Sequence, residues 1–170
     1  MKKLASKPSL PRKTSDLFSD LKDFDESERT AVMESRTIRY RNRHNRMTKA
    51  LKLHLPNATL VQGDDPECRF DVLVVNYDRN GRDLLIEAKP DHDKGSIRLA
   101  VGQLLDYRRS LPNRLATDLA VLTITRPAED YSAFLDDLQI SQIWFEGEAC
   151  SSLSCSGKIS LTLLALIVGN

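Results

Sequence analysis

The sequence predicts an α/β fold in which helices cover a mixed β-sheet. The first observation is that short apolar runs alternate with longer segments of helical periodicity, in the order helix, strand, strand, strand, helix, strand, helix, strand. The second is that 170 residues, 41% of them hydrophobic, are enough to bury one core. One domain is therefore expected over residues 29–148, between a flexible charged arm (1–28) and a tail with an apolar segment (149–170).

The first element is predicted to be a long helix over residues 29–55. This stretch contains neither Gly nor Pro before Pro56, and its apolar residues fall near helical spacing, at Val32, Tyr40, Met47, Leu51 and Leu55. Its middle is basic and holds no acid, with Arg36, Arg39, Arg41, Arg43, Arg46, Lys49 and Lys52. A nucleic-acid backbone is the natural partner for such a segment. The alternative is an ordinary solvated face, partly neutralised by the acidic stretch 16–28.

A short strand at residues 59–62 is expected to precede a β-hairpin. Residues 70–75 and 84–90 are rich in Val, Leu and Ile, and the loop between them contains the turn signal Asn80-Gly81. Two such runs around an Asn-Gly turn are typical of antiparallel neighbours.

The rest of the chain supplies alternating helices and strands. Residues 96–110 predict an amphipathic helix whose apolar face consists of Ile97, Val101, Leu104 and Leu105. Residues 119–125 predict a buried strand, 131–138 a short helix after a turn at Pro127, and 140–145 a further strand.

Charged residues lie within or beside both apolar runs of the hairpin. Asp71 stands in the first run, and Glu87-Ala88-Lys89 stands in the second. Residues two apart in a strand share a face, so Glu87 and Lys89 point the same way and Asp71 on the neighbouring strand can meet them. Charges removed from water are costly unless they are paired or bound to a metal. The plain alternative is an exposed ion pair of Glu87 with Lys89, with Asp71 capping a turn.

Two carboxylates and a lysine in this arrangement predict a metal-dependent phosphodiesterase site. Mg²⁺ prefers oxygen ligands, which Asp71, Glu87 and the backbone carbonyl of Ala88 would supply. Such an ion lowers the pKa of a bound water and neutralises charge on the phosphate. Lys89 would orient or help deprotonate the water, or contact the scissile phosphate as a cation.

The following helix adds Gln103 and Tyr107, which are four residues apart and share a helical face. With Asp71 and Glu87-Ala88-Lys89, this pair resembles the PD-(D/E)XK nuclease superfamily, the restriction-endonuclease-like fold, and within it the RecB-type and type I restriction branches. The resemblance covers about residues 30–148. The proline common before the first acid of that motif is absent, since Phe70 precedes Asp71.

The resemblance implies a restriction-endonuclease-like core and a Mg²⁺-dependent nuclease, with Mn²⁺ as a substitute metal. It implies metal ligation by Asp71 and Glu87 and catalysis by Lys89, with Gln103 and Tyr107 approaching the site or the substrate backbone. A residue of the first helix often joins such a metal site, here His44 or Glu34, and His44 is nearer the part of the helix that must pack on the sheet. The residues expected to contact DNA are Arg36, Arg39, Arg43, Arg46, Lys49, Arg98 and Arg108.

The composition bears on the cellular compartment and on membrane association. The three cysteines form neither a CxxC pair nor an even set, so a reducing cytoplasm is expected. The basic start lacks the apolar core of a signal peptide, and the apolar run 161–168 is shorter than the ~20 residues needed to cross a bilayer. No membrane association is expected. The run is predicted to be an added strand, a helix on the core, or a contact in a homodimer, and the sequence does not choose among these.

The expected function is hydrolysis of DNA phosphodiester bonds in restriction, repair or defence. A domain that keeps the fold and binds nucleic acid or protein without cutting is the alternative. A third reading is a metal held by the acids for structure only. The intact set of Asp71, Glu87 and Lys89 favours the nuclease, because a domain without catalysis has no chemical reason to keep all three.

Overall fold

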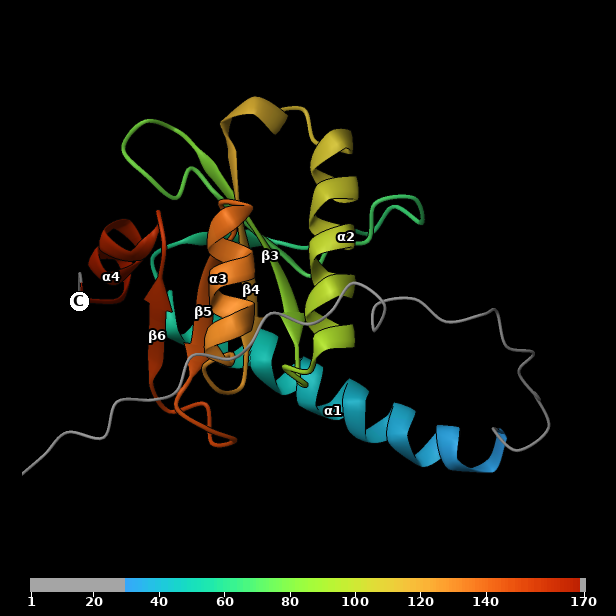
Figure 1. Cartoon of the computed structure of the whole chain (residues 1–170). Coiled ribbons are helices and arrows are strands. Elements are labelled where there is room, and N and C mark those ends of the chain that lie inside the picture. The colour runs from blue at the N-terminus through green and yellow to red at the C-terminus, as the bar shows by residue number, and fades with distance from the viewer. Residues whose placement is uncertain (1–29, 169–170) are drawn as a thin grey trace, which may run out of the picture. The chain divides into compact units, whose positions relative to one another are not determined.

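A computed structural model describes residues 30–168 of the chain, with side chains over residues 39–167. The predicted arm at residues 1–28 lies outside the described residues. Figure 1 shows a sheet with helices packed along it.

The sheet has six strands in the spatial order β1-β2-β3-β4-β5-β6. The strands are β1 (Thr59–Val61), β2 (Val72–Val75), β3 (Asp83–Lys89), β4 (Thr117–Thr123), β5 (Ser141–Phe145) and β6 (Leu153–Ser156). The central strands β3, β4 and β5 are parallel, whereas β1 and β2 on one side and β6 on the other pair antiparallel to their neighbours. The prediction of a mixed sheet in an α/β fold is confirmed.

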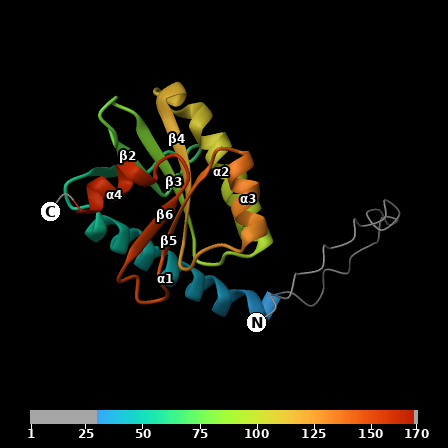
Figure 2. The same cartoon turned by 60° about the vertical axis from the view of Figure 1, so that its left-hand side comes forward.

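The sheet is covered on both faces. The helices are α1 (Thr30–His54), α2 (Lys94–Ser110), α3 (Glu129–Asp137) and α4 (Ser160–Val168), with a short 3-10 helix at Arg114–Ala116. Figure 2 shows α1 and α4 on one side of the sheet and α2 and α3 on the other. Two apolar clusters fill these layers: α1 and α4 contribute to one cluster, and α2 and α3 to the other.

Side chains alternate along each strand, so successive residues of β3 point to opposite faces of the sheet. Leu84, Ile86 and Ala88 of β3 belong to the cluster under α1 and α4, while Leu85 belongs to the cluster under α2. Because Glu87 lies two residues after Leu85, and Lys89 two after that, both charged side chains share the α2 face of the sheet. The helix on this face is therefore the one that can contact them.

The α2 helix begins after Asp93, whose carboxylate accepts hydrogen bonds from the amides of Gly95 and Ser96. Its buried residues are Ile97, Ala100, Val101 and Leu104. The prediction that Leu105 faces the core is wrong, since this side chain is 41% exposed. Leu105 lies at the edge of this stripe, where the buried side is completed by Ala100 and Val101 between Ile97 and Leu104.

Residues 153–168 complete the core. The β6 strand pairs antiparallel with β5, and Ile159 and Leu163 are fully buried in the cluster under α1 and α4. Of the three options for the apolar run 161–168, the structure shows a helix packed on the core. Its other side carries Leu161 and Leu164, which are exposed. None of the helices in the described part of the chain has the length and apolar character to cross a membrane.

Candidate active site

The β2–β3 hairpin brings the predicted acids together. Val72 pairs with Ile86 in the antiparallel register, so Asp71, one residue earlier, comes opposite Glu87, one residue later. The Asp71 Oδ2 atom accepts a hydrogen bond of 2.8 Å from the backbone amide of Ala88. This bond fixes the Asp71 carboxylate beside the β3 strand.

Glu87 and Lys89 form a buried ion pair on β3. The Lys89 Nζ atom donates to Glu87 Oε1 at 2.8 Å, and the two side chains are only 5% and 3% exposed. The alternative of an exposed pair is therefore wrong. The second carboxylate oxygen, Glu87 Oε2, is buried and has no hydrogen-bond partner. A buried oxygen of this kind is costly without a partner and is available to a further cation.

The electrostatics of the site favour an added positive charge. Burial raises the pKa of the Glu87 carboxyl above its usual range, and the nearby Asp71 charge raises it further, whereas Lys89 and His44 act in the opposite direction. One lysine therefore does not fully compensate two neighbouring acids.

The α2 helix supplies the predicted Gln103 and Tyr107. The Lys89 Nζ atom donates to Gln103 Oε1 at 2.6 Å, and Gln103 Nε2 donates to the Tyr107 hydroxyl at 3.3 Å. The ammonium of Lys89 is therefore held between a strand carboxylate and a helix amide. This fixes its position more closely than one partner would.

The α1 helix reaches the same site through His44. The His44 Nε2 atom lies 3.0 Å from Asp71 Oδ2, and this hydrogen bond raises the pKa of the imidazole although burial lowers it. Glu34 is the other helix residue predicted for the site, and its side chain lies outside the described residues.

Tyr40 is a neighbour of the site that the sequence predicts only as an apolar residue of the first helix. Its ring stacks on His44 with 6.4 Å between centroids. Burial, and then the charges of Asp71 and Glu87, raise the pKa of Tyr40 to about 12. Its four-residue spacing from His44 was the one available signal, since residues four apart share a helical face.

Acids from distant loops neutralise part of the basic helix. Arg43 donates to Asp91 at 2.6 Å and to Glu148 at 2.8 Å, and Arg46 also pairs with Glu148. These partners follow β3 and β5, and the acidic stretch 16–28 lies outside the described residues. Arg39 and Lys49 are exposed, and the side chain of Arg36 lies outside the described residues.

The two predicted DNA contacts on α2 lie far apart along that helix. Arg98 is exposed in its first half, and Arg108 stands near its end in a separate pocket. Ten residues of α-helix separate them by about 15 Å. The two arginines therefore do not form one basic patch.

The site fits a magnesium-type ion. Within residues 39–167, no three His, Cys, Asp or Glu side chains form a ready ligand set. Mg²⁺ does not require one, because it is typically held by one or two carboxylates together with waters and substrate oxygens. Asp71 and Glu87 supply two, and the unpartnered Glu87 Oε2 is a donor atom of the required kind.

No protein-family model matches this chain, and no curated protein matches it. Its fold is similar to the crystal structure of a repair endonuclease from Pyrococcus abyssi, at 12% identity and a TM-score of 0.44. The match covers 73% of this chain and 48% of the endonuclease chain, so this chain spans about half of that protein's length.

Proposed function

We propose that this protein is a Mg²⁺-dependent nuclease of the PD-(D/E)XK type that hydrolyses DNA phosphodiester bonds. The observation that carries the proposal is the buried arrangement of Asp71, Glu87 and Lys89 in which Glu87 Oε2 lacks a partner. If Glu87 and Lys89 formed only a structural ion pair, a second acid such as Asp71 beside them would weaken that pair. Restriction, repair and defence against foreign DNA are the processes that such an activity would serve.

Asp71 and Glu87 would hold the ion, together with the backbone carbonyl of Ala88. When bound, Mg²⁺ lowers the pKa of a water molecule and neutralises charge that develops on the phosphate. Lys89 stands beside Glu87 with its ammonium oriented by Gln103, so it would orient the attacking water or contact a phosphate oxygen. Water adds to phosphorus, the bond to one ester oxygen breaks, and that oxygen leaves with a proton as a strand end.

The backbone of DNA would lie along the exposed basic residues of α1. Arg39 and Lys49 are exposed on the helix that carries His44 into the site. Lysine and arginine contacts to phosphate provide affinity without sequence selection and weaken as salt rises.

The full chain is tested with Mg²⁺ or Mn²⁺ on duplex, single-stranded and branched DNA and on RNA. Asp71→Asn and Lys89→Ala are expected to lose cleavage by at least about a hundredfold while retaining DNA binding. Asp130→Asn, at an exposed acid of α3, is the matched control and should cut like the wild type. Calorimetric titration with Mn²⁺ should show weaker binding to the Asp71→Asn variant.

The outcomes separate the two readings of the fold. If the wild type binds DNA but cuts no substrate with either metal, the protein is the non-cutting module. If Asp71→Asn cuts as fast as the wild type, the proposed site is not the active site.

A further inference from the structure

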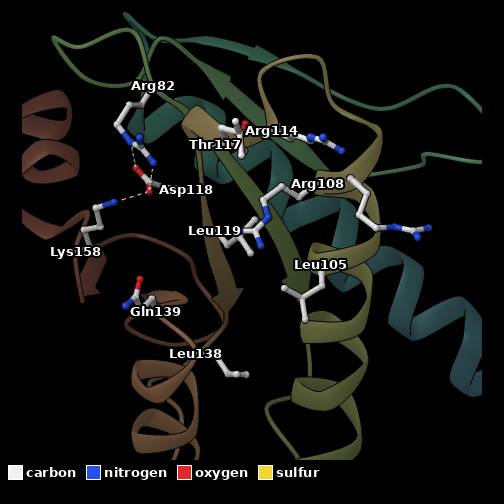
Figure 3. Close-up of a pocket in the computed structure, with 12 residues that line it drawn as sticks. Arg82, Leu105, Arg108, Arg114, Thr117, Asp118, Leu119, Leu138, Gln139 and Lys158 are labelled. Atoms are coloured by element: carbon white, nitrogen blue, oxygen red, sulfur yellow. Dashed lines mark hydrogen bonds and ion pairs between the residues drawn. The ribbon is translucent and has the colours of Figure 1, made fainter.

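A cavity lies at the opposite end of the central strands from the candidate active site. This cavity of about 490 Å³ opens where β4 begins, between the end of α2, the 3-10 helix and the turn after α3. Figure 3 shows its walls. Its volume falls within the range of small-molecule pockets, about 300–1,000 Å³.

This cavity is distinct from the candidate active site. Asp118 in its wall pairs in register with Leu84, and Lys89 lies five residues further along β3. At about 3.3 Å per residue, the two places are about 17 Å apart along the strand. A ligand in the cavity would not touch Glu87 or Lys89.

The wall of the cavity is strongly positive. It contains Arg82, Arg108, Arg109, Arg114 and Lys158, and Asp118 is its one acid. Because cations outnumber acids in the wall, the cavity attracts an anion.

Asp118 holds two of these cations in fixed positions. Its carboxylate accepts hydrogen bonds of 2.7 Å from both Arg82 Nε and Arg82 Nη2, and one of 2.9 Å from Lys158 Nζ. The Tyr77 hydroxyl adds a fourth bond of 2.6 Å. One acid shared by two cations leaves a net positive charge that is already positioned, so these side chains lose less conformational entropy when a ligand binds.

Two further arginines have charges available to a ligand. The Arg109 guanidinium pairs with Asp106, but Arg108 and Arg114 have no side-chain partner within the part of the chain that the structure describes. Arg108 points toward Leu119 inside the cavity (Figure 3). Guanidinium groups bind phosphate oxygens through paired, charge-assisted hydrogen bonds.

Exposed leucines stand beside these cations. Leu115 is 90% exposed, and Leu105 and Leu138 are 41% and 42% exposed, all in the wall of the same cavity. An apolar surface next to a group of arginines suits a ligand with one flat apolar end and one multiply charged end. A nucleotide has this combination of base and phosphates.

We propose that this cavity binds a free nucleoside polyphosphate. Its phosphates contact Arg108 and Arg114, with the Arg82 and Lys158 charges behind them, and its base packs on Leu115. The proposal does not depend on the nuclease function, because none of these residues belongs to the candidate active site. A phosphorylated end of a nucleic-acid strand carries the same chemistry, so the test includes it.

The test is calorimetric titration of the full chain with AMP, ADP and ATP. We expect affinity to increase with the number of phosphates, and the double variant Arg108→Ala/Arg114→Ala to bind ATP at least about tenfold more weakly. Lys94→Ala/Arg126→Ala removes the same charge from exposed positions, at the start of α2 and after β4, and should bind ATP like the wild type. Leu115→Ser, at an almost fully exposed position that leaves folding intact, should weaken ATP binding but not tripolyphosphate binding.

Three results would overturn the proposal. One is a wild-type chain that does not bind ATP. Another is equal ATP binding by the wild type and by both cavity variants. The third is binding of a 5′-phosphorylated oligonucleotide that depends on Arg108 and Arg114 and is not displaced by ATP. That result would assign the cavity to a strand end.

Discussion

Lys89 on β3 and Gln103 on α2 are joined by a hydrogen bond of 2.6 Å from Nζ to Oε1. The same ammonium is held by Glu87, so its position depends on one strand and one helix together. For the proposed reaction, Gln103 is thus a positioning residue that acts through Lys89.

Gln103→Leu should lower the cleavage rate more than Tyr107→Phe. The leucine removes a hydrogen bond to a charged group, which is worth about 1.5–3 kcal/mol and corresponds to a loss of roughly 10–150-fold in rate. The Tyr107 hydroxyl only accepts a 3.3 Å bond from Gln103, so its loss should cost less than about tenfold. Single-turnover rates on DNA measure both, and DNA affinity should stay constant. Equal losses in the two variants would contradict the role of Gln103.

The stability of the fold should depend on the charge of Asp118 at neutral pH. Burial raises the pKa of this carboxyl, but hydrogen bonds from Arg82, Tyr77 and Lys158 lower it more, so its net pKa lies well below the usual range. A depressed carboxyl pKa contributes stability above the unfolded value of about 3.9, and this contribution is lost as pH falls toward the folded value. Asp118→Asn should therefore destabilise the protein by about 1–3 kcal/mol at pH 7.

The difference between the wild type and Asp118→Asn should shrink as the pH falls below about 4. Urea unfolding over a pH series measures it. Glu67→Gln, at an exposed acid outside the helices and strands, is the control and should follow the wild type at every pH. A difference that stays constant from pH 7 to pH 3 would show that Asp118 acts through shape and not through charge.

Local sequence predicted the hairpin and the position of its charged residues, because strand alternation and an antiparallel register are local rules. These rules alone place Glu87 and Lys89 on one face with Asp71 opposite, and the structure has this arrangement. Leu105 was misplaced because an apolar residue at the edge of a helical stripe can face either way, and only the neighbouring elements decide.

Contacts between distant parts of the chain could not be predicted. Arg43 and Glu148 are 105 residues apart and meet because α1 crosses the edge where β5 ends. The cavity at Asp118 likewise combines the hairpin turn, the end of α2 and the turn before α4. No spacing rule connects such segments, since their approach depends on how the layers pack.

The α4 helix should contribute to stability through one face only. Leu163 is fully buried, and truncation to Ala should cost about 2–5 kcal/mol in the free energy of unfolding. Leu161, on the same helix, is 86% exposed, and Leu161→Ala should change stability by less than about 0.5 kcal/mol. Denaturant unfolding of both variants measures the contrast. Equal effects would mean that α4 does not pack on the core in solution.

Gly63 should be intolerant of any side chain because the loop that leads to Asp71 closes tightly around it. Its amide donates to the Phe70 carbonyl at 3.0 Å, and a Cβ atom at this position would lie 2.1 Å from the Cys68 carbonyl oxygen and 2.7 Å from the Phe70 backbone nitrogen. These atoms belong to the backbone, so relief requires the loop to move. Gly63→Ala should therefore destabilise the protein by about 1–3 kcal/mol.

Gly102 provides the matched comparison. A Cβ atom there would meet no atom within 4 Å, and the residue lies in the middle of α2. Gly102→Ala should stabilise the protein by about 0.5–1 kcal/mol, because alanine loses less backbone entropy in a helix. Thermal unfolding of the two variants should thus shift in opposite directions. Because Asp71 directly follows Phe70, Gly63→Ala should also weaken Mn²⁺ binding, whereas Gly102→Ala should leave Mn²⁺ binding unchanged. A Gly63→Ala protein with wild-type stability and Mn²⁺ affinity would show that this loop does not position the Asp71 carboxylate.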